Sequence, residues 1–131
     1  MKHLLDINTL LALAHVAHVH HPRAIAWYRS LPVGTTSLGT CAITELGFVR
    51  VAVQAGLQAD VPAARKALAA LKSTSAIPFE LMNDALGVDR LPGFAKTPPK
   101  LTDGHLLELA RENKAQLATL DSGIPGADML P

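Results

Sequence analysis

The chain has 131 residues, 49% of them hydrophobic, which predicts a single globular domain over residues 1–131. Twelve lysines and arginines against eleven acidic residues give a net charge of +1, so charge alone does not indicate a nucleic-acid partner. Cys41 is the single cysteine, which excludes an internal disulfide. No segment has the roughly 18 uninterrupted apolar residues of a membrane span. We therefore expect a cytoplasmic protein with no membrane segment.

The first part of the chain alternates strand and helix patterns. Residues 3–7 (HLLDI) form a short apolar run typical of a buried parallel strand. Asn8 or Thr9 can cap a helix that begins at about Thr9. A second helix is predicted over residues 22–31, with proline in its first turn, and residues 35–38 (TTSL) are predicted to form the second strand.

The middle of the chain has two helical patterns and a weaker strand pattern. Apolar residues recur at helical spacing over residues 40–55, and Gly56 is placed to end that helix. Residues 60–73 (DVPAARKALAALKS) predict an amphipathic helix capped by Asp60. Residues 76–81 (AIPFEL) indicate a third strand, which its proline restricts to a sheet edge.

The last part contains a loop, a helix and two strands. Prolines and glycine make residues 92–99 a loop, and Thr102 is the expected cap of a helix over residues 101–113. Strands are predicted over residues 116–120 and 127–130. Because strands and helices alternate, the chain is expected to be an α/β protein with a mostly parallel central sheet.

Four acidic residues stand at positions that such a sheet would bring together. Asp6 ends the first predicted strand, Asp121 follows the fourth, and Asp103 lies in the first turn of the last helix. Glu45 lies among apolar neighbours in the helix predicted over residues 40–55. Ligand sites of parallel sheets gather beyond the carboxyl ends of the strands, although any one of these acids could simply cap a helix.

Clustered carboxylates predict a bound cation. Like charges a few ångströms apart raise each other's pKa, and a divalent cation removes that conflict. Oxygen ligands suit Mg²⁺ or Mn²⁺, which also bind the oxygens of phosphate esters. A metal would therefore explain why an acid such as Asp6 is tolerated within the apolar stretch LLDINT.

Four segments also carry a resemblance to a known family. LLDINTLLAL at 4–13, TELGFVR at 44–50, LTDGHLLELA at 101–110 and LATLD at 117–121 resemble the acidic blocks of PIN-domain ribonucleases. Within that superfamily they are most similar to the VapC-type toxins of bacterial toxin–antitoxin pairs. The resemblance implies a PIN-like three-layer α/β/α fold and a Mg²⁺- or Mn²⁺-dependent endoribonuclease that hydrolyses RNA phosphodiester bonds.

The resemblance also implies roles for particular residues and partners. The catalytic and metal-binding acids would be Asp6, Glu45, Asp103 and Asp121, with Asn8 and Thr119 as supporting polar residues. A small antitoxin encoded alongside the toxin would keep it inactive. The resemblance, together with the apolar surface of the two middle helices, suggests a homodimer. Gly104 and His105 depart from the family, which often has a small residue and an aromatic after the third acid.

Basic residues could line a path for RNA. Assigning four acids to one pocket leaves seven acids against twelve basic residues, an excess of five positive charges on the remaining surface. The candidates along the path are Arg23, Arg29, Arg50, Lys96 and Lys100. His15, His18, His20 and His21 are more typical of a solvated helix end and turn than of a zinc site, because no cysteine or acid lies near them.

Two other functions remain open at the level of sequence. One is a receiver-like protein with a nucleophilic aspartate, but Asp6 has no acidic neighbour and Lys114 precedes its strand instead of following it. The other is a non-catalytic α/β binding module whose acids are only helix caps. That second alternative gives no reason for Glu45 in its apolar helical setting.

Overall fold

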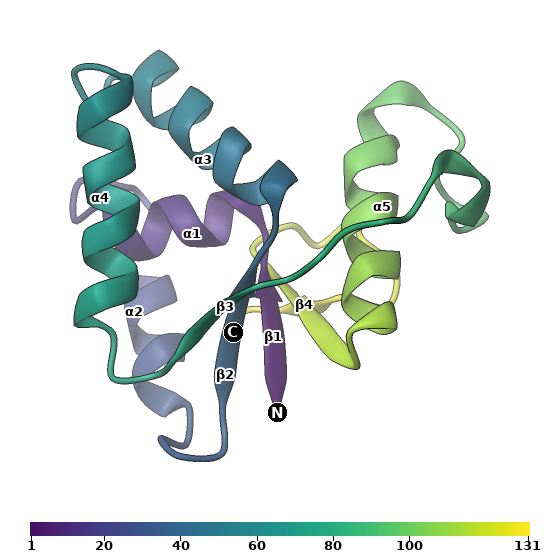
Figure 1. Ribbon diagram of the computed structural model, residues 1–131, viewed down its shortest axis with the longest axis horizontal. Coiled ribbons are helices and arrows are strands. Elements are labelled where there is room, and N and C mark those ends of the chain that lie inside the picture. Colours follow the sequence, from purple (N-terminus) through teal and green to yellow (C-terminus); the bar gives the residue numbers. More distant parts are fainter.

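The structure, a computed structural model, describes residues 1–131 and is built around one five-stranded sheet (Figure 1). The spatial order of the strands is β3-β2-β1-β4-β5, and every neighbouring pair is parallel. The strands are β1 (Lys2–Leu5), β2 (Ser37–Thr40), β3 (Phe79–Leu81), β4 (Ala115–Thr119) and β5 (Asp128–Met129). The sheet that the sequence predicted as mostly parallel is thus parallel throughout.

Helices cover both faces of this sheet and make three layers (Figure 1). One face carries four helices, which are α1 (Ile7–Ala14), α2 (His21–Ser30), α3 (Ala42–Gln54) and α4 (Val61–Thr74). The other face carries α5 (Leu101–Glu112), which is preceded by two short 3₁₀ helices, η1 (Val88–Arg90) and η2 (Pro98–Lys100). None of the helices is long and apolar enough to cross a membrane.

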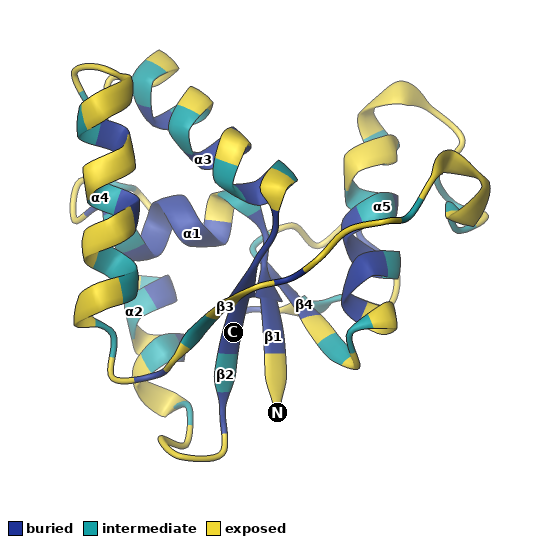
Figure 2. Cartoon of the chain, viewed as in Figure 1, coloured by how far each residue is buried: buried dark blue, intermediate teal, exposed yellow.

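The central strands supply both halves of the core by alternation. Leu5 and Ala118 pack with the residues of α1 to α4, whereas their neighbours Leu4 and Leu117 pack with α5. Successive side chains of a strand point to opposite faces, so a strand buried on both faces reads as a continuous apolar run. Figure 2 shows this burial along β1, β2 and α1.

The path of the chain places a ligand site at one edge of the sheet. From β1 the chain moves outward through β2 to β3, and then returns through α5 to β4 on the other side of β1. The strand order therefore reverses between β1 and β4. In open parallel sheets the crevice beyond the carboxyl ends of the strands at this reversal is the usual place for a ligand.

The observed helix caps differ from two of the predicted ones. Asp6, not Asn8 or Thr9, caps α1, which begins at Ile7. Thr102 does not cap α5, because the 3₁₀ turn η2 runs directly into that helix. The predicted cap Asp60 is confirmed, with its Oδ1 accepting from the amide of Ala63 at 2.8 Å.

The observed strand boundaries differ from the predicted ones by up to three residues. The first strand ends at Leu5, so Asp6 lies just beyond it, and the second strand is 37–40 in place of 35–38. The third is confined to Phe79–Leu81, after Pro78, and is an edge strand as predicted. The shift of the second strand matters for the site, because it makes Thr40 the last residue of β2.

Candidate active site

Asp6 is held at the carboxyl end of β1 by two hydrogen bonds. Its Oδ1 accepts from the amide of Ile7 at 2.8 Å, which caps α1, and its Oδ2 accepts from the hydroxyl of Thr119 at 2.8 Å. The side chain is buried, and burial raises the pKa of its carboxyl; the charge of Asp121 raises it further, while the two hydrogen bonds oppose this. Asp6 is therefore both a helix cap and a buried acid.

Thr119, a predicted supporting residue, connects the ends of β1 and β4. It is the last residue of β4 and is fully buried. While its hydroxyl donates to Asp6, the same oxygen accepts from the amide of Asp121 at 3.0 Å. One threonine thus fixes the position of one acid and the backbone of another.

Asp103 and Asp121 lie close enough to Asp6 for their charges to interact. Asp103 is half-buried in the first turn of α5, and burial raises the pKa of its carboxyl, with the charges of Asp6 and Asp121 adding to the effect. Lys100 opposes that shift. Asp121 is exposed on the loop after β4, where its Oδ1 accepts from the amide of Gly123 at 2.7 Å. Three of the four predicted acids therefore converge beside the strand-order reversal.

The donor set suits a hard divalent cation, although the side chains are not yet arranged around one. Asp6 and Asp103, whose carboxyl pKa is raised by burial and further by neighbouring aspartate charges, gain from a cation beside them. As placed, however, no group of three or more acidic, histidine or cysteine side chains is close enough to hold a metal ion. Asp6 is fixed by two hydrogen bonds and is buried, whereas Asp121 is exposed and gives up only the hydrogen bond from the Gly123 amide when it changes rotamer.

Glu45, the fourth predicted acid, is held by other groups. Its Oε2 accepts from the hydroxyl of Thr40 at 2.5 Å and forms an ion pair with Lys72 of α4. The charges that shift the pKa of Asp6 and Asp103 do not include that of Glu45. Sequence reasoning missed Lys72, which is 27 residues away and looks like an ordinary basic residue in the last turn of a helix.

The remaining predicted residues lie at varying distances from the acids. Asn8 is exposed in the first turn of α1 with no side-chain hydrogen bond. Lys100 donates to the carbonyl of Gly123 at 3.3 Å and so lies within the acidic site. Lys96 is exposed in the loop before it. Arg23 instead binds the C-terminus, with its Nε donating to the carbonyl of Pro131 at 2.9 Å.

Arg50 and Arg29 are exposed on helices. Arg50 lies along a groove between α3 and α4, and Arg29 is in the last turn of α2. Neither forms an ion pair. Of the five basic candidates, Lys100 is the one placed among the acids.

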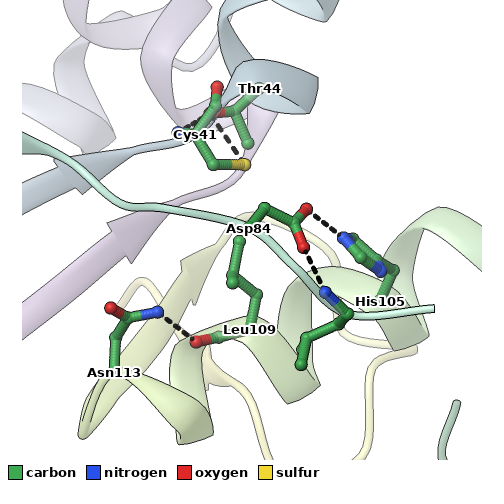
Figure 3. Close-up of polar contacts among 7 residues, drawn as sticks. Cys41, Thr44, Asp84, His105, Leu109 and Asn113 are labelled. Carbon is green, nitrogen blue, oxygen red and sulfur yellow. Dashed lines mark hydrogen bonds and ion pairs between the residues drawn. The ribbon is translucent and has the colours of Figure 1, made fainter. Parts of the chain in front are cut away.

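His105 has a partner that the sequence did not indicate. Its Nε2 lies 2.5 Å from Oδ2 of Asp84, whose Oδ1 accepts from the amide of Leu86 at 3.1 Å (Figure 3). The pair joins α5 to the extended segment that follows β3. The side chain of His105 is largely covered, with 16% of its surface exposed.

The histidines at 15–21 are not grouped closely enough for three of them to hold a metal ion. His15 is buried, stacks on Phe48 and contacts the carbonyl of Leu11 through Nδ1 at 2.9 Å. The expectation of a solvated helix end is therefore wrong for His15. His18 accepts through Nδ1 from the amide of His20, which is exposed. These contacts are structural.

Fold and site together define the class of the protein. A three-layer α/β/α fold with three aspartates at the reversal of a parallel sheet fits the PIN-like arrangement expected from the acidic blocks. The structure is similar, with a TM-score of 0.68, to that of Mycobacterium tuberculosis VapC20, a toxin that cleaves the sarcin–ricin loop. The alignment covers 98% of this chain and 99% of that one at 14% identity, so it supports the fold alone.

Sequence relatives identify the family. VapC38 ribonuclease of M. tuberculosis is 36% identical over 92% of this chain and 86% of its own length. VapC29 ribonuclease of the same species is 38% identical over 95% and 89%. VapC44 is 34% identical over 97% and 94%. No protein-family model matches the chain. The chain belongs to the VapC ribonuclease family.

Proposed function

We propose that this protein is the toxin of a toxin–antitoxin module and cleaves RNA with the help of Mg²⁺ or Mn²⁺. The observation that carries the proposal is the convergence of Asp6, Asp103 and Asp121: burial raises the carboxyl pKa of the first two, and the charge of Asp121 adds to both shifts. Clustered acids of this kind are costly unless a cation or a reaction uses them. Membership of the VapC ribonucleases favours this function over a receiver-like or purely structural one.

The chain's own residues would divide the work of binding and orientation. Asp6, Asp103 and Asp121, joined by Glu45, would be the ligands, and Thr119 would keep Asp6 in place. A bound Mg²⁺ or Mn²⁺ would supply an activated water and stabilise negative charge on the phosphate and the leaving oxygen. Asn8, exposed beside Asp6 at the start of α1, can orient a water or a phosphate oxygen.

The substrate is proposed to be RNA in the cytoplasm. VapC20 is described as cleaving the sarcin–ricin loop, and we carry over to this chain only the class of substrate. Lys96 and Lys100 stand just before Asp103, where they can contact phosphates on either side of the scissile bond. Arg50 lies farther away on α3. RNA phosphates are recognised by such cations irrespective of sequence.

The proposed antitoxin would dock between α3 and α4. These helices form a groove of about 800 Å³. Its apolar floor includes Val49, Val53 and Leu68, and basic side chains from both helices stand along it, including Arg50 and Arg65. An amphipathic helix with acidic residues beside its apolar face matches that chemistry. The exposed Leu46 at the same groove is otherwise costly in water.

A homodimer of the free toxin is also proposed, because apolar side chains of α3 and α4, among them Leu46 and Val61, remain exposed as long as no antitoxin covers them. Light scattering at micromolar concentration measures the mass directly. A mass of about 28 kDa, twice that of one chain, supports the dimer. A strictly monomeric mass of 13.8 kDa contradicts it.

Cleavage of RNA by the purified protein tests the proposed activity. We expect cleavage with Mg²⁺ or Mn²⁺, much weaker cleavage with Ca²⁺, whose looser geometry positions water less strictly, and none with excess EDTA. Asp121→Asn is the matched control, since it keeps the shape of the side chain and removes its charge. Undiminished cleavage in EDTA would rule out the metal-dependent mechanism.

A further inference from the structure

One acid of the proposed metal site is already paired with a cation of the chain itself. Glu45 is bound by Lys72 Nζ and by the hydroxyl of Thr40, so that β2, α3 and α4 meet at a single carboxylate oxygen. Both charged side chains are about one-third exposed, with fractions of 27% for Glu45 and 31% for Lys72. Water therefore screens the attraction between the two charges only in part, and the two side chains are not buried in the core.

The other three acids have no such partner. None of Asp6, Asp103 and Asp121 forms an ion pair, and Lys100 reaches the nearby carbonyl of Gly123 instead of a carboxylate. Glu45 is thus the one member of the proposed ligand set that the protein neutralises itself. Its charge is also not among those that shift the pKa of Asp6 or Asp103.

Lys72 has room to leave Glu45. Both residues line the groove between α3 and α4, which has a volume of about 800 Å³ and is open to solvent. A lysine side chain has a flexible four-carbon stem and a strongly hydrated ammonium, so it can move into that groove at little cost. Thr40 would remain as the fixed hydrogen-bond donor to Glu45.

We infer that Lys72 is an internal counter-ion that competes with the metal for Glu45 and must release it when the metal binds. The inference rests on the metal-dependent function proposed above. Lys72 is a positioning residue in this scheme, because it acts through Glu45 and does not itself bind substrate. Its presence keeps Glu45 ordered and neutralised in the metal-free protein and weakens metal binding by the strength of the ion pair.

Titration calorimetry with Mn²⁺ on the full chain tests the inference. Partly exposed ion pairs are weak, so Lys72→Met should bind Mn²⁺ about two- to fivefold more tightly than the control Lys66→Met. Lys66 is exposed on the same helix and forms no ion pair, so the control removes the same charge. Lys72→Arg, which keeps a cation at Glu45, should bind Mn²⁺ like the wild type.

A double-mutant cycle isolates the pair. In a Glu45→Gln background, Lys72→Met and Lys66→Met should bind Mn²⁺ equally, because Glu45→Gln removes the carboxylate for which Lys72 and the metal would compete. Thermal melts verify folding, and Lys72→Gln is measured in the same way if Lys72→Met does not fold.

The outcomes separate the two proposals. If the wild type binds Mn²⁺ but Lys72→Met binds it no more tightly than Lys66→Met, the counter-ion role is wrong and the metal site stands. If the difference persists in the Glu45→Gln background, Lys72 acts through some other group and the inference also fails. If neither the wild type nor any variant binds Mn²⁺ at millimolar concentration, the proposed metal dependence itself is wrong.

Discussion

Asp6 combines two roles that local sequence reasoning treats as alternatives. One carboxylate oxygen caps α1 and the other accepts from Thr119, so the acid is fixed at the carboxyl end of β1. Burial disfavours its charge, and the hydrogen bonds make up only part of that cost, since its pKa remains raised. The same geometry that supports the helix therefore also holds an acid ready for a cation.

Replacing Asp6 by asparagine separates these roles. A raised pKa in the fold means that ionisation of Asp6 costs stability, and this cost is fully present above the raised pKa, including at neutral pH. Asparagine caps helices as well as aspartate does and carries no charge. We expect Asp6→Asn to melt at the same or a higher temperature without metal, and we expect Mn²⁺ to raise the melting temperature of the wild type but not that of Asp6→Asn.

Asp6→Ala is the comparison variant. It removes the charge and the cap together, and loss of a cap costs about 1 kcal/mol. It should therefore be less stable than Asp6→Asn in metal-free melts. If Asp6→Asn melts below the wild type, Asp6 contributes to stability chiefly as a charged group.

His3 is a buried histidine outside the site. It packs edge-on against Trp27, with ring centroids 5.4 Å apart, and its Nδ1 has no hydrogen-bond partner. Burial lowers its pKa below the usual 6.5; Asp128 opposes the shift, and the terminal amine adds to it. The unfolded chain consequently takes up a proton here more readily than the fold does.

Stability should therefore fall as the pH drops below about 6.5, where the unfolded chain becomes protonated at this position. His3→Phe keeps an aromatic ring against Trp27 and removes the titrating group, so it should lose less stability between pH 7.5 and 5. Urea unfolding at both pH values measures this. His20→Asn, at an exposed position, is the control. If this variant also loses less stability than the wild type between pH 7.5 and 5, and by the same amount as His3→Phe, the assignment to His3 is contradicted.

At the scale of elements, α5 depends on close packing at its first turn. Gly104 follows Asp103 and faces the loop that crosses α5, where an added Cβ would lie 2.8 Å from Cβ of Ala95 and 3.2 Å from Cδ of Pro92. Neither neighbour has a flexible side chain that could give way. The small residue therefore allows the loop carrying Lys96 to lie against the helix that carries Asp103.

Gly104→Ala should move that loop and destabilise the protein by about 1–3 kcal/mol, as overpacking does. The expected readouts are a lower urea midpoint and weaker RNA cleavage. Gly93→Ala in the same loop is the matched control, because an added Cβ there meets no atom within 4 Å. Equal stability of the two variants would mean that the loop adapts without cost.

At the scale of the whole molecule, a nearly neutral chain separates its charges. Lys100, in the 3₁₀ turn before α5, reaches the loop after β4, and Lys96 is exposed in the loop that precedes this turn. RNA binding should weaken steeply with salt, because each phosphate contact releases counterions.

Lys96→Ala should weaken RNA binding and reduce the slope of log affinity against log salt by about one. Lys100→Ala should add to this without abolishing Mn²⁺ binding. Lys114→Asn is the control. Lys114 precedes β4, at the opposite end of the sheet from the acids, and asparagine tolerates the positive φ of 54° at this position. An unchanged slope in the double variant Lys96→Ala with Lys100→Ala would place the RNA path elsewhere.

The sequence by itself determined the order of elements and the acids that follow them. Apolar runs separated by amphipathic helices specify a parallel sheet, because both faces of each strand must be buried. That sheet brings Asp6, Asp103 and Asp121 close enough for their charges to interact. The boundaries of the elements were predicted less accurately, because they depend on individual hydrogen bonds. At the start of α1, Asp6, Asn8 and Thr9 are all residues that can cap a helix, and the structure shows that Asp6 does so.

Only the tertiary structure decided which side chains meet across long stretches of chain. Lys72 reaches Glu45 because α3 and α4 pack side by side, and Asp84 reaches His105 because the segment after β3 passes over α5. No local pattern encodes such contacts, since they depend on the angle and register at which distant elements pack. The sequence therefore predicts the acids of the site, while the packing determines that Glu45 is paired with Lys72 and that the three aspartates form no ion pair.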